Sequence, residues 1–316
     1  MNRRDFLKSS AIAGGVGTLA PWAVAPAQTR MAQPSGGLQL NIFSKHLEFL
    51  EYEEMARVTK AMGFDGVDLT VRETGHVEPE NVIRDLPRAV EAIEKHGLNH
   101  DMMTTFVDDA SNPVDRRVLQ TASEQGIRFY RMNWFRYDEN QSLPESIAGY
   151  RQRIHELDRL NQGYDLVGCY QNHAGTLVGA SLWEIHEMLQ DADPESFGVQ
   201  YDLRHAVVEG GLSWENGLRL VAPRIRTLVL KDVRWSQRPD GSWYTENVPF
   251  GEGMVDWSRY FKLLKEYNIQ VPVSVHFEYP LGGANRGQER VTIHRDRIYQ
   301  AMIRDLEAIR TLWASV

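Results

Sequence analysis

The sequence is poor in cysteine, in long apolar runs and in basic residues. Cys169 is the only cysteine among 316 residues, which excludes an internal disulfide framework and any cysteine-rich metal site. Because it lies inside an apolar run, we expect a buried and unreactive thiol. Apart from a short N-terminal stretch, no run is long and apolar enough to cross a bilayer.

Acidic residues outnumber basic ones by 43 to 35, and the formal net charge is −8 at pH 7. Nucleic-acid surfaces need clustered lysine and arginine to contact phosphates, so a nucleic-acid partner is not expected. Hydrophobic residues make up 42% and charged residues 25%, which is ordinary for a soluble globular protein with a sizeable core. The length allows one large barrel or two medium domains.

The N-terminus carries the features of an export signal. Arg3 and Arg4 precede a modestly apolar stretch at 11–24, and residues 25–27 fit the small-x-small pattern that signal peptidase accepts. We predict that residues 1–27 are a twin-arginine signal peptide, which exports a folded protein to the periplasm. An N-terminal membrane anchor is the alternative, although the stretch is short of the ~20 residues needed to span a bilayer.

Cleavage after Ala27 would change the net charge from −8 to −10, since three basic residues and one acidic residue leave with the signal. We expect residues 28–37 to form a flexible linker and residues 38–316 to form the folded domain. After cleavage no membrane association is expected, and the oligomeric state stays open.

From Leu38 onward, short apolar runs alternate with longer amphipathic ones. Eight such strand–helix units without a break in composition predict an α/β fold, a single (β/α)8 TIM barrel. A doubly wound sheet is the competing fold, but it would place a glycine-rich phosphate loop after its first strand. Residues 44–48 contain no glycine, which favours the barrel. The expected strands lie at 38–43, 66–69, 100–106, 129–134, 166–170, 197–201, 225–230 and 271–275.

Two connecting segments stand out. The Gly210-Gly211 pair should close the turn after the sixth strand, and a long polar excursion should run from Trp235 to Asp256. Active sites of parallel barrels lie at the carboxyl ends of the strands. The polar residues at these ends therefore form the candidate site.

The sixth strand ends in Asp202, and Arg204 and His205 follow. A carboxylate and an imidazole on one turn can share a cation or a sugar hydroxyl. In the fifth strand, the period-two alternation puts Gln171 and His173 on one face. Hydrogen-bonding side chains at the end of a buried strand are costly unless something polar meets them.

The seventh strand delivers Lys231 to the barrel mouth, where the alternative is a salt bridge with Asp232. In the eighth strand, His276 and Glu278 share a face that we take to point into the barrel; a buried structural histidine is the alternative for His276. Four consecutive strands thus bring carboxylate, imidazole, amide and ammonium groups to one end. That convergence is typical of a site for a small polyol or a divalent cation.

Three further residues lie near the predicted mouth. His76 follows a glycine in the loop after the second strand, Trp134 follows the fourth strand, and Arg234 follows the seventh. We expect them to orient a substrate, with a sugar ring stacked on Trp134. A solvated loop histidine and a tryptophan used for packing are the plain alternatives.

Short segments at the strand ends carry a family resemblance when they are taken in order: Gly75-His76-Val77, Tyr170-Gln171-Asn172-His173, Tyr201-Asp202-Leu203-Arg204-His205, Leu230-Lys231-Asp232, Gly251-Glu252-Gly253, Val255-Asp256-Trp257 and Val275-His276-Phe277-Glu278. This order resembles the sugar phosphate isomerase/epimerase family of xylose-isomerase-like TIM barrels, which also contains inosose dehydratases and endonuclease IV. The resemblance implies a divalent metal (Mn²⁺, Mg²⁺, Co²⁺ or Zn²⁺) held by Glu, Asp, His and Glu from strands five to eight. It also implies that the two glutamates act as acid and base; no organic cofactor is expected.

The sequence departs from that pattern at three strand ends. The resemblance implies a glutamate where this chain has Gln171, a histidine where it has Val229, and a glutamate where it has His276. Of the four implied metal ligands, only Asp202 is the residue type that the resemblance implies. An amide cannot act as a base at neutral pH, so Gln171 cannot take the role of a proton-exchanging glutamate. A metal held by Asp202, His276 and Gln171, with His173 as a further choice, is what the resemblance still implies.

We therefore expect an exported, sugar-active, isomerase/epimerase-like enzyme that transfers a proton next to the carbonyl of a sugar or keto-sugar. The alternatives are a keto-glycoside lyase or hydratase, and a non-catalytic sugar-binding barrel that has lost its metal. The expected catalytic residues are His276 and Glu278 for the proton and Lys231 for the enolate oxygen. The expected substrate-binding residues are His76, Trp134, His173, Arg204, His205 and Arg234.

Overall fold

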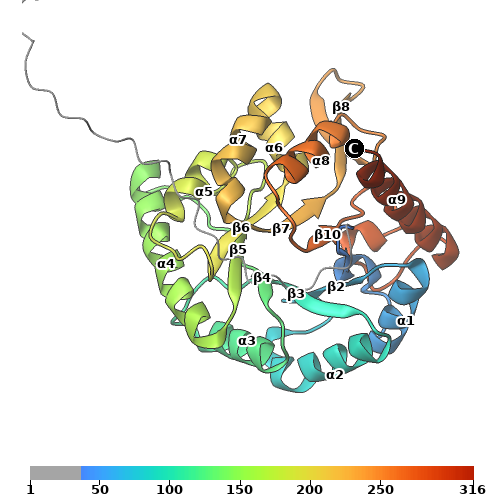
Figure 1. Cartoon of the computed structure of the whole chain (residues 1–316), viewed down its shortest axis with the longest axis horizontal. Coiled ribbons are helices and arrows are strands. Elements are labelled where there is room, and N and C mark those ends of the chain that lie inside the picture. Colours follow the sequence, from blue (N-terminus) through green and yellow to red (C-terminus); the bar gives the residue numbers. More distant parts are fainter. Residues whose placement is uncertain (1–36) are drawn as a thin grey trace, which may run out of the picture. The chain divides into compact units, whose positions relative to one another are not determined.

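The computed structural model of the chain describes residues 37–316. The predicted signal peptide lies outside the described residues, as does the predicted linker except for Gly37. Eight parallel strands close into one barrel (Figure 1), which confirms the predicted (β/α)8 TIM fold. The barrel strands are β1 (Leu40–Phe43), β2 (Gly66–Val71), β3 (Asn99–Thr105), β4 (Phe129–Arg131), β5 (Val167–Gln171), β6 (Phe197–Asp202), β7 (Ile225–Leu230) and β10 (Val273–Val275).

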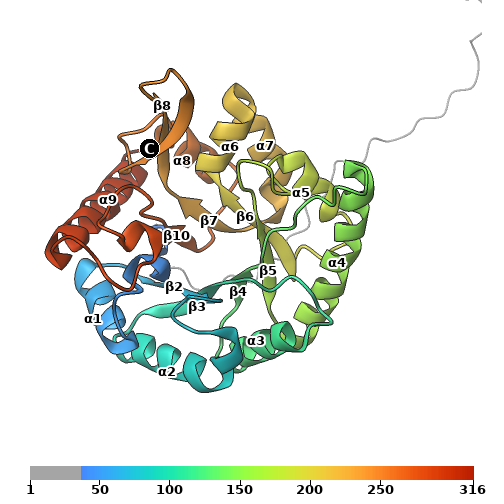
Figure 2. The same ribbon diagram turned by 180° about the vertical axis from the view of Figure 1, so that it is seen from behind.

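Helices surround the barrel on its outside, as the two opposite views show (Figure 1, Figure 2). In α1 the buried residues Met55, Val58 and Met62 recur every three to four positions and form one apolar face. Gly63 ends this helix at a φ of 92°, a left-handed conformation that favours glycine. Within residues 37–316, no helix has both the length and the apolar composition that a membrane-spanning segment needs. The helices outside the barrel are α1 (Tyr52–Met62), α2 (Val82–Lys95), α3 (Pro113–Glu124), α4 (Leu143–Tyr164), α5 (Leu182–Met188), α6 (Leu203–Gly210), α7 (Trp214–Val221), α8 (Trp257–Glu266) and α9 (Arg295–Ser315).

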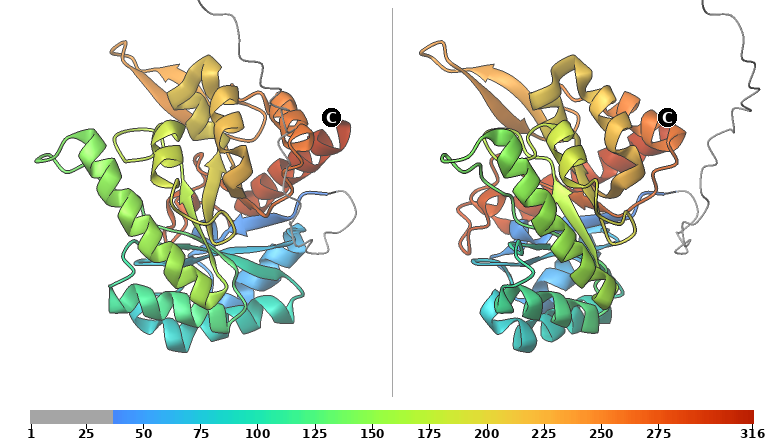
Figure 3. Two further views of the ribbon diagram at one scale, coloured as in Figure 1. Left: turned by 60° about the vertical axis from the view of Figure 1, so that its left-hand side comes forward. Right: turned by 90° about the vertical axis from the view of Figure 1, so that its left-hand side faces the viewer.

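The segment predicted to be a long polar excursion contains most of an antiparallel hairpin, formed by β8 (Asp232–Gln237) and β9 (Trp243–Val248). The sequence pattern did not reveal these strands, because both are mostly accessible to solvent and lack the apolar alternation of a half-buried strand. The hairpin, drawn in orange, stands out from the barrel (Figure 3). The hairpin directly follows β7 in the chain and forms a separate two-stranded sheet that does not join the barrel.

The turn predicted after the sixth strand is a helix, α6. Asp202 caps its N-terminus, because Oδ1 accepts the backbone N–H of His205 at 3.2 Å. Gly211, with a φ of 49°, follows the last residue of α6 and ends it. Arg204 and His205 consequently lie on the first turn of a helix rather than in a glycine-closed loop.

A small apolar cluster lies between β3, β4 and β5. The parallel register brings Met102, Phe129, Val167 and Cys169 together inside the barrel. Burial raises the pKa of the Cys169 thiol to about 12. The thiol is therefore buried and protonated, in agreement with the sequence-based expectation.

Candidate active site

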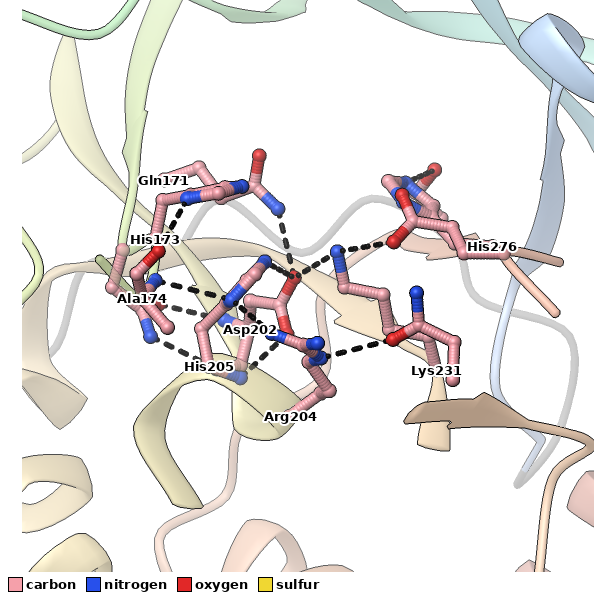
Figure 4. A network of polar contacts seen from close by, with 12 residues as sticks. Gln171, His173, Ala174, Asp202, Arg204, His205, Lys231 and His276 are labelled. Carbon is pink, nitrogen blue, oxygen red and sulfur yellow. Dashed lines mark hydrogen bonds and ion pairs between the residues drawn. The ribbon is translucent and has the colours of Figure 1, made fainter. Parts of the chain in front are cut away.

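Asp202, the last residue of β6, is fully buried at the centre of a polar cluster (Figure 4). Its Oδ2 atom accepts a hydrogen bond from Nε2 of Gln171 at 2.8 Å and lies 3.2 Å from Nζ of Lys231. Nε2 of His205 is 3.6 Å from the same oxygen. Burial raises the pKa of Asp202, although the Lys231 ammonium favours the ionised form. Three neighbouring strand ends thus meet at one carboxylate.

Asn172 fixes the backbone at this carboxylate. Its Nδ2 donates to the carbonyl oxygen of Asp202 at 2.9 Å, and its Oδ1 accepts the N–H of Asp202 at 2.8 Å. Both the donor and the acceptor of this fully buried side-chain amide therefore have a hydrogen-bond partner. This pair of bonds joins the ends of β5 and β6 and holds Asp202 in one position.

Lys231 connects Asp202 to a second carboxylate, that of Glu278. Its Nζ lies 3.3 Å from Oε2 of Glu278, and its side chain is only 4% exposed. Oε1 of Glu278 is 3.7 Å from Nζ of Lys45 and 3.7 Å from Nδ1 of His276. Burial opposes the ionisation of Glu278, but the positive charges of Lys231 and Lys45 outweigh it and hold its pKa well below the usual range. The Glu278 side chain is therefore ionised, and it remains 22% exposed.

A chain of hydrogen bonds orients His276. Ser274 donates its hydroxyl to Asp68, so its oxygen accepts from Nε2 of His276 at 3.1 Å. The imidazole also stacks on Phe43 with ring centroids 4.3 Å apart. Nε2 therefore carries the proton, and Nδ1 turns its lone pair toward Glu278. Burial lowers the pKa of His276 to about 3, so that the ring is neutral at pH 7.

His205 is also neutral by geometry. Its Nδ1 accepts the backbone N–H of Ala174 at 3.1 Å and meets Nη1 of Arg204 at 3.0 Å. A nitrogen that faces two donors presents its lone pair, so the ring proton lies on Nε2, toward Asp202. Burial, followed by the charge of Lys231, lowers the pKa of His205 well below its usual value.

His173 and Trp134 border this group. The His173 ring lies 4.0 Å from the His205 ring and 4.7 Å from the Trp134 ring, measured between centroids. Trp134 donates its indole N–H to the carbonyl of Gln171 at 3.0 Å, and the Arg131 guanidinium lies 4.0 Å from its ring centre. Burial lowers the pKa of His173 to about 4. Neutral imidazoles and an aromatic ring thus line the side of the cluster formed by β4 and β5.

A sequence model of xylose isomerase-like TIM barrels matches residues 56–302. The chain belongs to the xylose isomerase-like TIM barrel family. None of the curated proteins compared is significantly similar to it in sequence.

Solved structures share the fold of this xylose isomerase-like barrel over most of its length. D-psicose 3-epimerase with D-tagatose, from Clostridium cellulolyticum H10, is 10% identical with a TM-score of 0.65, covering 87% of this chain and 99% of its own. The apo form of 3-keto-D-glucoside 4-epimerase from E. coli is 14% identical with a TM-score of 0.59, at 85% and 99% coverage. A xylose isomerase-like protein from Mycobacterium smegmatis, in complex with magnesium, is 14% identical with a TM-score of 0.61, at 86% and 98% coverage. At these identities the likeness shows the fold.

Two predicted site residues lie apart from the Asp202 cluster of this xylose isomerase-like barrel. The His76 side chain is 3% exposed, and its Nδ1 is 3.2 Å from Oε2 of Glu48, beside β1 and β2. Arg234 lies on the exposed hairpin and donates from Nε to Glu246 at 2.8 Å. Among residues 37–316, neither forms a hydrogen bond or ion pair with the cluster. The expected loop histidine facing the mouth is instead a buried one.

Asp232 anchors the segment before α8 and does not neutralise its neighbour Lys231. Its Oδ2 accepts the N–H groups of Gly251 at 2.9 Å and Gly253 at 3.2 Å, and the indole N–H of Trp257 at 2.9 Å. A Cβ atom on Gly253 would lie 2.1 Å from Oδ1 of Asp232, so this close approach requires glycine. Lys231 is therefore left to bridge the carboxylates inside the barrel.

Lys45 belongs to the site and was not singled out from the sequence. It follows β1 in the short 3₁₀ segment Ser44–Leu47 and reaches Glu278. The rule that predicted Lys231, a charged residue just past a barrel strand, applies equally to Lys45. The residue type and the position that identify Lys45 as a site residue are therefore present in the sequence.

The divalent metal implied by the family resemblance does not fit the donor set as it is arranged. In the described part of the chain, no three or more His, Cys, Asp or Glu side chains are grouped so that they could hold a metal. Gln171 presents an N–H donor rather than its carbonyl oxygen to Asp202. Nε2 of His276 is used by Ser274, and the lone pair of its Nδ1 lies beside Oε1 of Glu278, which is not one of the predicted ligands. The predicted ligands therefore do not present free lone pairs to one common point.

Proposed function

We propose that this barrel is an enzyme that transfers a proton next to the carbonyl group of a sugar or keto-sugar. One observation carries the proposal: Nζ of Lys231 bridges Asp202 and Glu278, and Glu278 lies beside Nδ1 of His276. A cationic group and two bases thus stand together at the carboxyl ends of barrel strands, where barrel enzymes carry out their chemistry.

Lys231 is the group that binds the carbonyl oxygen. An ammonium has three N–H donors, and the ion pairs of Lys231 among the described residues are with Asp202 and Glu278. The third donor is available to a substrate oxygen. A fixed cation in a largely buried site stabilises the negative charge that develops on this oxygen as the enolate forms.

Glu278 or His276 takes the proton. Glu278 is ionised and reaches the solvent-accessible mouth, and Nδ1 of His276 has its lone pair on the same side. As the base removes the proton from carbon, the electron pair of the C–H bond moves into the enolate. Return of a proton from solvent to the opposite face epimerises the carbon. Return of a proton to the former carbonyl carbon, with the hydroxyl proton of the deprotonated carbon passing to the former carbonyl oxygen, isomerises the sugar. Loss of a leaving group from the next carbon instead completes an elimination, as in a keto-glycoside lyase.

The groups around Lys231 and two structural neighbours support a sugar as substrate. The neutral rings of His173 and His205 and the guanidinium of Arg204 offer hydrogen-bonding groups in a mostly buried setting, as hydroxyl recognition requires. The neighbours are a 3-epimerase solved with D-tagatose and a 3-keto-D-glucoside 4-epimerase. We assign keto-sugars as the first substrate class to test.

We also propose that Arg3 and Arg4 direct the export of the folded chain to the periplasm. The arginine pair, the apolar stretch behind it and the small residues at 25–27 support this. Replacing both arginines with lysine should keep the full-length precursor in the cytoplasm, as immunoblots of cell fractions would show. Arg30→Lys, in the predicted linker, is the matched control and should not change export. Mature periplasmic protein from the double variant would overturn the proposal.

Exchange of hydrogen with solvent tests the catalytic proposal. Keto-sugars are incubated with the protein in deuterated water, and NMR follows deuterium at the carbon next to the carbonyl. Lys231→Met and Glu278→Gln should each slow incorporation by at least about 100-fold, because each removes a group that acts in the transition state. Lys262→Met and Glu91→Gln, at exposed positions, are the matched controls. Binding of a sugar without any exchange contradicts the proposed reaction.

A sugar-binding barrel without catalysis is the second candidate, and the same bridge favours it. Lys231 engages both carboxylates, and a closed set of ion pairs can recognise hydroxyl groups without moving a proton. Calorimetry would then show saturable sugar binding that Asp202→Asn weakens, with no deuterium incorporated. The exchange experiment therefore separates the two candidates.

A further inference from the structure

We infer that the ammonium group of Lys231 takes the place of the divalent metal that the family resemblance implies, so that the site works with a built-in cation. What this cation does to a substrate rests on the function proposed above. The position of the cation rests only on the contacts of the described residues.

The first argument is the position of Nζ. It lies 3.2 Å from Oδ2 of Asp202 and 3.3 Å from Oε2 of Glu278. Figure 4 shows the Lys231 side chain reaching toward Asp202. Two carboxylate oxygens that converge on one point are what a cation site needs. Here the convergence point holds a nitrogen at ion-pair distance instead of a metal at roughly 2.0–2.6 Å.

The second argument is the charge balance. Even with Asp202 and Glu278 both ionised, their two negative charges are matched by the two positive charges of Lys231 and Lys45. A divalent cation would add two further positive charges to a buried site that is already neutral. Uncompensated buried charge is strongly unfavourable. The guanidinium of Arg204, which bonds to His205 beside Asp202, makes the surroundings still less suited to a metal.

The third argument is the use of lone pairs. Nδ1 of His205 is taken by two N–H donors, and the Gln171 amide faces Asp202 with its nitrogen. On β7, the residue in register with Asp202 and Ser274 is Val229, which is fully buried and has no ligand atom. Two residues further on, on the same face of the chain, stands Lys231. The strand thus supplies a cation where a metal site would need a ligand.

The wild-type protein is the first subject of the test. After treatment with a chelator and exchange into metal-free buffer, it is titrated with Mn²⁺ and with Zn²⁺, followed by calorimetry and by the Mn²⁺ electron paramagnetic resonance signal. We expect no stoichiometric binding and no change of melting temperature on addition of EDTA. Binding of one metal ion per chain that Asp202→Asn abolishes overturns the inference.

A variant provides the complementary measurement. Lys231→Ala removes the built-in cation and leaves the carboxylates of Asp202 and Glu278 facing the same space. This variant should bind one Mn²⁺ per chain at least about tenfold more tightly than the wild type, since the competing ammonium is gone. Adding Asp202→Asn to the Lys231→Ala variant should abolish this increase in Mn²⁺ affinity. Lys262→Ala, which removes an exposed lysine, is the control and should behave like the wild type.

Lys231→Gln is made alongside, in case the alanine variant does not fold, and circular dichroism reports the fold of both. A folded variant that binds Mn²⁺ no more tightly than the wild type overturns the inference. If neither variant folds, the wild-type titration decides the question alone. No sugar is present in these titrations. A failure to exchange deuterium therefore contradicts the proposed reaction without affecting the cation assignment, and the converse also holds.

Discussion

Phe277 donates its backbone N–H to Nε2 of His46 at 2.9 Å, and so ties the residue before Glu278 to the segment after β1. Nδ1 of the same ring bonds to the carbonyl oxygen of Ala284 at 3.2 Å and must be the donor there. The fully buried imidazole is therefore neutral, with both of its nitrogens in use. It holds both ends of the segment that carries Glu278.

His46→Ala should destabilise the protein by about 3 kcal/mol at pH 7.5, because two buried backbone groups lose their partners. Burial lowers the pKa of His46 well below its usual value of 6.5. The stabilisation is therefore complete above pH 6.5 and is lost as the pH falls, because the unfolded chain then binds a proton that the folded chain does not. The difference in free energy of unfolding between the wild type and His46→Ala should therefore narrow by about 1.4 kcal/mol per pH unit below pH 6.5.

Urea denaturation at pH 7.5 and pH 5.5 measures this gap. His155→Ala, at an exposed position on α4, is the matched control and should leave stability unchanged at both values. A gap that widens on acidification would contradict the neutral imidazole.

The rate of proton transfer should be flat between pH 5 and pH 8 as far as Glu278 and His276 are concerned. The pKa of Glu278 is held well below its usual range by its neighbouring cations, and burial lowers the pKa of His276 to about 3. Both bases are thus unprotonated over this interval. Lys45→Ala removes one of these cations and should raise the pKa of Glu278, so that activity begins to fall at a higher pH on acidification. The pH profile of deuterium incorporation measures this, and an inflection near pH 6.5 in the wild type would assign the proton to another group.

Glu48 should make the protein less stable as the pH rises. Burial raises the pKa of this carboxyl group to about 8, although the Thr70 hydroxyl opposes the shift. A carboxyl group with a raised folded pKa stabilises fully below its unfolded pKa, near 4.5, and its contribution is lost as the pH approaches 8. Glu48→Gln keeps the shape without titrating. Between pH 5 and 8, the free energy of unfolding of Glu48→Gln should rise relative to that of the wild type by up to about 1.4 kcal/mol per pH unit.

Thermal and urea denaturation across this interval checks the Glu48 prediction. Glu91→Gln, at an exposed position on α2, should show no such trend. Equal stabilities of wild type and Glu48→Gln at pH 8 would mean that the carboxyl group ionises without cost beside His76.

Much of the fold and part of the site follow from short-range patterns. Parallel strands in register bring residues at equal heights together, so the period of two that placed His276 and Glu278 on one face also placed them inside the barrel. Asp202 and Lys231 could be found in the same way, because each stands at the end of an apolar strand. The predicted meeting of Gln171 with Asp202 is seen as a hydrogen bond.

The remaining features depend on tertiary packing that no local pattern encodes. His76 is buried because the segment after β1 folds over it and brings Glu48 to its ring. The predicted loop after β6 became α6 because the Asp202 side chain caps a helix while it also serves the cluster. This double role of Asp202 becomes visible only in the folded structure, where both α6 and the polar cluster are formed. The bridging of two carboxylates by one lysine likewise depends on distances across the barrel.

Arg204 should prove to be the link between the hairpin and the site. Nε donates to Oδ1 of Asn247 at 3.2 Å, Nη2 donates to Oγ1 of Thr245 at 3.2 Å, and Nη1 meets Nδ1 of His205. Arg204→Ala removes these contacts from a buried position. Amide hydrogen exchange in β9 should then become about tenfold faster, since local opening of the hairpin is less costly.

Mass spectrometry of peptides covering 243–248 measures this exchange. Arg290→Ala, at an exposed position, is the control and should leave the rate unchanged. Arg204→Lys separates support of the hairpin from a direct role at the site. It keeps a positive charge but cannot reach three acceptors at once, so exchange in β9 should also become faster in this variant if the hairpin depends on those contacts. If exchange in β9 stays at the wild-type rate in Arg204→Ala, the hairpin is held by its own cross-strand pairs, and Arg204 acts on His205 alone.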